Sequence, residues 1–122
     1  MNYKIEIRYN GKEIEGMLMS TTTFEVNKTN FNDMVLAVEM ISNLLFEAEC
    51  IVAEKDLPVT DITLKMYSDN DVLFNSVTEF MDYKKRHRIE TRIRSNWSLI
   101  TYVNNIPYHG EIVEGMLVSS RN

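Results

Sequence analysis

The chain is poor in the residues that build cross-linked or reactive sites. Its 122 residues include one cysteine, two histidines and one tryptophan. Cys50 alone cannot form an intramolecular disulfide, which fits a reducing compartment, so we expect a cytoplasmic protein. Because Cys50 falls in an apolar stretch, we expect its thiol to be a small buried hydrophobe rather than a nucleophile.

Sequence patterns typical of catalytic or metal centres are missing as well. The chain has no HExxH or CxxC motif, no paired histidines and no GxSxG elbow. Asp69-Asn70-Asp71 resembles the start of a calcium loop, but Leu73 stands at the fifth position and no glycine comes sixth. We therefore expect a non-enzymatic protein with no cofactor and no metal.

The chain also lacks a long hydrophobic run. No apolar segment approaches the roughly 20 residues that a helix needs to span a bilayer, so we expect no membrane partner. Ala, Gly, Pro and Arg are scarce, whereas Asn, Ile, Met, Lys, Tyr and Phe are plentiful. This bias is typical of A/T-rich genomes, such as those of many low-GC bacteria and their phages.

Alternation of polar and apolar residues predicts the strands. Residues Tyr3–Tyr9 alternate strictly, and Asn10-Gly11 is the pair most suited to a two-residue hairpin turn. Lys12 to about Ser20 is then the returning strand, with an extension to Val26 left open. Further strands are predicted at Ile62–Tyr67, Arg88–Arg94, Trp97–Asn104 and Glu111–Ser119.

Two segments change to the helical period. Asn30 is a plausible N-cap for one long helix over Phe31–Asp56, whose polar residues form only a narrow stripe. Such a helix needs cover on more than one side. A second, shorter helix is predicted over Val72–Arg86, capped from the Ser68–Asp71 segment.

The element order is then ββ-α-β-α-βββ. It predicts a single α+β domain over residues 1–122, in which an antiparallel or mixed sheet of about six strands packs against one long and one shorter helix. Because one sheet and two helices cannot easily cover every side of the long helix, we also expect self-association as a homo-oligomer, in the simplest case a homodimer.

Two nearly identical decapeptides stand at the two ends of the chain. GKEIEGMLMS begins at Gly11 and GEIVEGMLVS begins at Gly110. We interpret each as the second strand of a hairpin, with Gly16 and Gly115 at a bulge or a close backbone approach. A phosphate-binding loop is disfavoured, because Met-Leu rather than Lys-Ser/Thr follows the second glycine.

Charge is concentrated in one run. The net charge is −5, yet KKRHRIETRIR, from Lys84 to Arg94, carries six Lys and Arg against one Glu. The candidate binding residues are Lys84, Lys85, Arg86, Arg88, Arg92, Arg94 and Trp97. The run fits either a solvated helix end and sheet face or an anion-binding face, in which evenly spaced strand arginines contact phosphates or carboxylates.

Two functions follow from these patterns. The leading one is a small protein-binding module that works as a homo-oligomer, for example a phage or mobile-element accessory protein that inhibits or recruits a host protein. The alternative is an anion binder that uses Lys84–Arg94 for a nucleotide or nucleic acid; the overall acidity argues against general nucleic-acid affinity.

Overall fold

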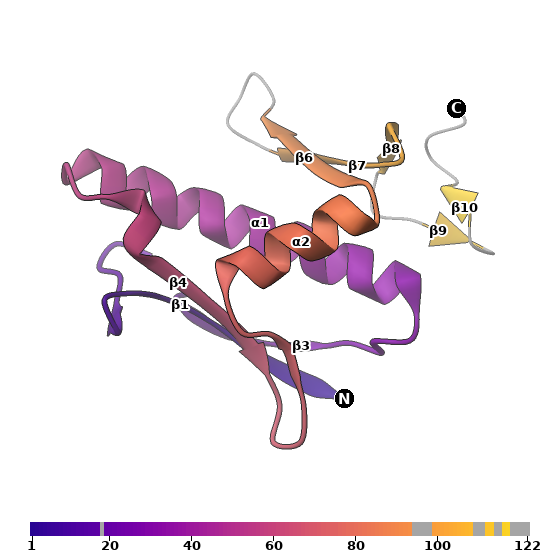
Figure 1. The fold of residues 1–122 in the computed structure, drawn as a ribbon, viewed down its shortest axis with the longest axis horizontal. Coiled ribbons are helices and arrows are strands. Elements are labelled where there is room, and N and C mark those ends of the chain that lie inside the picture. The colour runs from indigo at the N-terminus through magenta and orange to yellow at the C-terminus, as the bar shows by residue number, and fades with distance from the viewer. Residues whose placement is uncertain (18, 94–98, 109–111, 114–115, 118–122) are drawn as a thin grey trace.

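A computed structural model describes residues 1–17, 19–93, 99–108, 112–113 and 116–117. Within these residues the chain is α+β, with one long and one short α-helix and eight strands in two antiparallel sheets, in the order βββ-α-ββ-α-βββ, followed by a separate two-stranded hairpin. The predicted class is therefore confirmed, although the strands form two sheets rather than one. Both helices lie between the two sheets (Figure 1).

The first sheet has five strands with β1 at its centre. β1 pairs antiparallel with β4 on one side and with β2 and β3 on the other, while β5 pairs with β4. The strands are β1 Asn2–Tyr9, β2 Lys12–Glu13, β3 Thr21–Glu25, β4 Ile62–Tyr67 and β5 Val72–Phe74. Tyr3, Ile5 and Ile7 are fully buried along one face of β1, as their alternation predicted.

The turn after β1 has the predicted geometry, but the returning strand is interrupted. Asn10 and Gly11 both have positive φ, 51° and 80°, as a two-residue hairpin loop requires. Between β2 and β3 the chain leaves the ladder and turns at Gly16, whose φ is 101°. The prediction of one strand from Lys12 to about Ser20 was therefore wrong, because β2 ends at Glu13. Gly16, where a bulge or a close backbone approach was expected, lies in the loop between β2 and β3, and its positive φ bends the backbone away from β1.

The long helix, α1, spans Phe31–Glu54. Its N-cap is Asn30, whose side chain accepts a hydrogen bond from the Asp33 N–H at 3.2 Å. Both the cap and the length match the prediction to within two residues. Cys50, expected to be buried, is only half-buried.

Residues 72–76 are not helical, in contrast to the prediction for Val72–Arg86. Val72–Phe74 forms β5, and the Ser68–Asp71 segment makes the β4–β5 turn rather than a helix cap. The second helix, α2, spans Val77–Arg86. Two hydrogen bonds fix its N-terminus: the N-cap Ser76 Oγ accepts from the Glu79 N–H at 3.1 Å, and Glu79 Oε1 accepts from the Asn75 N–H at 2.9 Å.

The second sheet follows α2. It contains β6 Ile89–Ile93, β7 Leu99–Val103 and β8 Ile106–Tyr108, paired antiparallel in that order. The first two match predicted strands, whereas β8 was not foreseen, because Asn104 and Asn105 both adopt positive φ and turn the chain back at once.

The C-terminal decapeptide differs from the single strand expected over Glu111–Ser119. Ile112–Val113 (β9) pairs antiparallel with Met116–Leu117 (β10), so the chain folds back on itself. Gly115 lies outside the described residues. The two decapeptides are therefore similar in sequence but differ in structure: the first contains the short strand β2, and the second contains the β9–β10 pair.

Cover for α1 comes from both sheets. Met34, Ile41 and Val52 are buried, together with Val35 on a neighbouring face of the helix, and the same cluster of buried side chains includes Phe80 of α2 and Ile89 of β6. The expected cover on more than one side is thus supplied within the chain. In the described residues no helix is long and apolar enough to cross a membrane.

Candidate functional site

The basic run begins at the end of α2, as predicted. Lys84, Lys85 and Arg86 occupy the last helical turn, where cations complement the negative end of the helix dipole. Arg86 also lies over the Tyr83 ring, with its Cζ atom 5.9 Å from the ring centroid. These three positions therefore have a structural role in addition to any binding role.

Arg88 does not belong to the strand that was expected to carry it. Its φ is 55°, and β6 begins one residue later. The residue makes the corner between α2 and β6: its carbonyl accepts the Asn104 N–H at 2.8 Å, and its Nη1 donates to Asn104 Oδ1 at 3.4 Å. The predicted even row of Arg88, Arg92 and Arg94 on one strand face is therefore wrong for Arg88.

Arg92 lies on the outer face of β6 and is already paired. Its Nε and Nη2 donate to Glu90 Oε2 at 3.1 and 2.9 Å, and its Cζ lies 4.0 Å from the centroid of the Tyr102 ring on β7. These hydrogen bonds to the Glu90 carboxylate raise the pKa of Arg92. Much of its charge is thus compensated locally. Arg94 and Trp97, the remaining predicted site residues, lie outside the described residues.

Lys84 turns toward the opposite face of β6. Its Nζ donates to Thr91 Oγ1 at 3.0 Å, and Thr91 alternates with Arg92 along the strand. Burial lowers the pKa of Lys84, and the nearby Glu90 and Glu49 carboxylates oppose that shift. The fold therefore divides the basic run between two faces of the second sheet.

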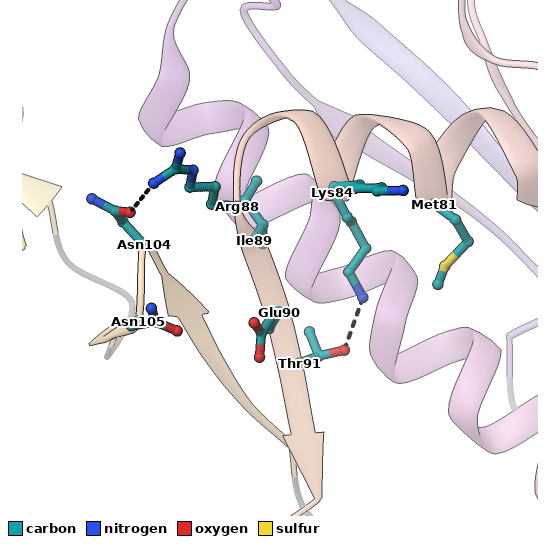
Figure 2. A pocket seen from close by; sticks show the side chains of 9 residues that line it. Met81, Lys84, Arg88, Ile89, Glu90, Thr91, Asn104 and Asn105 are labelled. Carbon is teal, nitrogen blue, oxygen red and sulfur yellow. Dashed lines mark hydrogen bonds between the residues drawn. The ribbon is translucent and has the colours of Figure 1, made fainter.

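Part of the run surrounds a cavity of about 600 Å³, which we call the edge hollow. Figure 2 shows this cavity with the Lys84–Thr91 and Arg88–Asn104 hydrogen bonds across its walls. Its lining consists of Met81, Lys84 and Lys85 of α2, residues 88–91, and the Asn104-Asn105 turn. Three cations and two amides face one carboxylate here, so the edge hollow favours anions.

A second cavity, of about 560 Å³, lies where α1, α2 and the second sheet meet, and we call it the groove. Its lining is mostly apolar and includes Leu45 and Phe46 of α1, Phe80 of α2 and Leu99 of β7. Glu49, Lys84 and several hydroxyls add polar groups. Such a mixture is typical of a binding site, in which apolar side chains give affinity and a few polar groups orient the bound molecule.

Exposed hydrophobic side chains gather around the groove. Val59, Met81 and Ile93 have 41%, 51% and 63% of their surface exposed, and all three line it. Scattered exposed hydrophobics are ordinary, but a contiguous patch indicates an interaction site. Ser42 also lines the groove, and its buried hydroxyl has no hydrogen-bond partner among the described residues. A molecule in the groove could supply that partner.

Sequence reasoning located the edge hollow in part and missed the groove. The groove is assembled from residues between positions 42 and 99, which no local pattern connects. In the described residues no group of three or more His, Cys, Asp or Glu side chains could hold a metal ion. The chain matches no protein-family model, no curated protein and no solved structure. What it binds must therefore be inferred from its own surface.

Proposed function

We propose that this chain is a small, non-enzymatic protein-binding module that acts in the cytoplasm, works as a homodimer and holds its partner in the groove. The observation that carries the proposal is that the exposed side chains of Val59, Met81 and Ile93 all line one mostly apolar cavity. Size and A/T-rich coding bias support an accessory protein of a phage or mobile element that inhibits or recruits a host protein.

Charge supports the kind of partner. The chain has a net charge of −5, and much of its concentrated positive charge lies at the end of α2 and along β6. A partner with exposed apolar side chains complements the groove, whose charged lining is one carboxylate (Glu49) and one ammonium (Lys84). A net basic partner also complements the net charge of the whole chain. Its apolar side chains would carry most of the affinity, since buried anchors dominate binding energy at interfaces.

Paired substitutions test the groove. Val59→Asp and Met81→Asp each place a charge in its apolar lining, and we expect each to reduce the amount of partner captured from host extract by at least about tenfold. The matched controls are Leu57→Asp and Val72→Asp, whose parent side chains are 43% and 50% exposed but do not line the groove. Capture is measured by quantitative mass spectrometry.

The controls decide the outcome of that experiment. A partner bound in the groove is retained by Leu57→Asp and Val72→Asp and lost by the two groove variants. Equal capture by all four variants would remove the groove as the binding site. Equal loss by all four would show that added negative charge, and not the groove, controls binding.

A second candidate function rests on the edge hollow. Lys85 and Arg88 are exposed there, and the Arg88 guanidinium donates to the neutral Asn104 amide, so both side chains can contact a nucleotide phosphate. If the hollow binds a nucleotide, Lys85→Gln with Arg88→Gln should weaken binding of a fluorescent nucleoside triphosphate more than about tenfold and reduce its salt dependence.

The control for the nucleotide titration is Lys4→Gln with Arg8→Gln on β1, which removes the same charge from the first sheet. If both pairs weaken binding equally, the attraction is nonspecific and the edge hollow has no special role. Arg92 is a poor choice for this test, because its guanidinium already contacts Glu90 and Tyr102.

A further inference from the structure

β6 is an edge strand with one side open. β7 pairs with one edge, and within the described part of the chain no strand pairs with the other. The Asn104 N–H to Arg88 carbonyl hydrogen bond marks these facing residues as a hydrogen-bonded pair. Hydrogen-bonded and non-hydrogen-bonded pairs alternate along an antiparallel ladder, so Ile89, Thr91 and Ile93 direct their backbone groups away from β7, toward the open edge.

Space lies beside this open edge. The edge hollow is lined by Ile89, Glu90 and Thr91, three successive residues of one strand. Successive side chains in a strand point to opposite faces, so a cavity that touches all three reaches around β6, between α2 and the Asn104-Asn105 turn. An added strand would enter this space, below Met81 of α2.

The sequence of β6 is complementary to itself. β6 reads Ile-Glu-Thr-Arg-Ile. When two copies of this strand run antiparallel and Thr91 faces Thr91, Ile89 faces Ile93 and Glu90 faces Arg92. The apolar residues meet apolar residues. Each carboxylate, which already accepts from the guanidinium of its own strand, meets a second guanidinium across the pair.

Pair geometry also suits the charges. In this register Thr91 and the two isoleucines form hydrogen-bonded pairs, which use their outward backbone groups. Glu90 and Arg92 then fall in non-hydrogen-bonded pairs, whose Cα atoms are closer, about 4.5 Å apart. Opposite charges directly across a ladder are stabilising, and like charges there are destabilising.

Exposure singles out β6 among the sheet edges. Ile93 is 63% exposed, more than any other large hydrophobic residue in the described part of the chain, and a second copy whose Ile89 faces it would cover part of that surface. Among the other edge strands, β2 is only Lys12-Glu13, with no apolar residue to bury, and β8 (Ile-Pro-Tyr) carries no charge. The edge strand β5 carries no charged residue, and β3 carries only Glu25. Neither β5 nor β3 can form charge pairs with its own copy.

We propose that β6 is the dimerisation strand: two copies of the chain pair antiparallel through β6 about Thr91 and join their second sheets into one continuous six-stranded sheet. This deepens the proposed function, because it names the surface through which the module self-associates. It rests on the self-association in that proposal. In such a dimer the second copy covers part of Ile93 in the groove lining and occupies the edge hollow, so this pairing and a nucleotide in the edge hollow exclude each other.

Charge reversal with rescue tests the pairing. Glu90→Arg places two arginines opposite each other, and Arg92→Glu places two glutamates opposite each other, so we expect each variant to raise the dimer dissociation constant more than about tenfold. An equimolar mixture of the two variants restores opposite charges at both positions and should form a heterodimer. The double variant E90R/R92E is again self-complementary and should dimerise. Mass is measured by light scattering after gel filtration.

Two further measurements complete the test. Glu25→Arg and Lys12→Glu, exposed strand positions of the first sheet, should keep the dimer mass, and circular dichroism melting of each variant confirms folding. A monomeric parent chain, or single variants that remain dimers, would overturn the pairing, and so would a mixture that stays monomeric. Partner capture sensitive to Val59→Asp would stand in each case, so the groove as a binding site can survive the loss of the pairing. A monomeric parent chain would end the proposed homodimer as well, whereas a dimer that is insensitive to the β6 variants would overturn the pairing alone.

Discussion

Phe80→Ala should lower the free energy of unfolding by about 3–5 kcal/mol, the usual cost of removing a buried phenylalanine side chain. Phe80 is 1% exposed and packs edge-on against Phe74 with ring centroids 5.4 Å apart. It lies in α2, while Phe74 belongs to β5, so their contact attaches the helix to the first sheet. Its loss leaves a cavity between these elements.

The neighbouring residue supplies the control for Phe80. Met81 is 51% exposed, and Met81→Ala should change the free energy of unfolding by less than about 1 kcal/mol. Urea denaturation measures both variants. If Phe80→Ala were no more damaging than Met81→Ala, α2 would not be held to the first sheet by this contact.

Tyr3→Phe should cost about 1–2 kcal/mol and change the response to alkaline pH. The Tyr3 hydroxyl, on a side chain only 1% exposed, donates to Asp71 Oδ2 at 2.7 Å, and Lys28 Nζ donates to the same oxygen at 2.9 Å. A hydrogen bond to a charged acceptor is worth more than a neutral one. Without the Tyr3 hydroxyl, the Asp71 carboxylate keeps its ion pair with Lys28, which is more exposed to solvent and therefore weaker than the buried hydrogen bond.

The sign of the alkaline effect follows from the pKa of Tyr3. Burial, together with the hydrogen bond and the charge of Asp71, raises that pKa from 10.0 to about 12. The folded state therefore holds the phenol proton more tightly than the unfolded state does. This contribution is fully present below about pH 10 and is lost as the pH rises through about 12. Tyr3→Phe should lose less stability in this interval than the parent chain.

The acid side behaves in the opposite sense. Hydrogen bonds from Tyr3 and Lys28 lower the pKa of Asp71, so its contribution is present above the ordinary carboxyl range and disappears as the pH falls through the lowered value. Thermal melts from about pH 3 to about pH 12 record both effects. Parallel curves for the parent and Tyr3→Phe would show that the Tyr3–Asp71 hydrogen bond does not contribute.

Local patterns predicted the elements that depend on local forces. These elements are the alternating strand Tyr3–Tyr9, the Asn10-Gly11 turn and the Asn30 cap of α1. Each could be predicted because interactions between residues close in the sequence determine it. The stretch from Val72 to Phe74 was misread as helix because its apolar spacing also fits the period of α2. Its pairing with Met66 and Tyr67 on β4 decides the outcome, and no local pattern encodes that pairing.

The candidate site shows the same division. The basic residues are consecutive in the sequence and were therefore predicted as one cluster. In the structure, the alternation of side chains along β6 and the positive φ of Arg88 place them on different faces of the second sheet. Ser42 and Ile93 both line the groove although they lie far apart in the sequence. The self-complementary Ile-Glu-Thr-Arg-Ile sequence was present throughout, yet it gains meaning only once β6 is known to be an edge strand.

Hydrogen–deuterium exchange tests the central claim, that the groove holds a protein partner, without any substitution. The chain is compared alone and in complex with the partner whose capture Val59→Asp abolishes. We predict that binding slows exchange in peptides that cover residues 42–49, 59–62 and 77–84, which contribute side chains from α1, the segment before β4, and α2 to the groove. Slowed exchange confined to β1, β2 and β3, with no change in these peptides, would contradict the account.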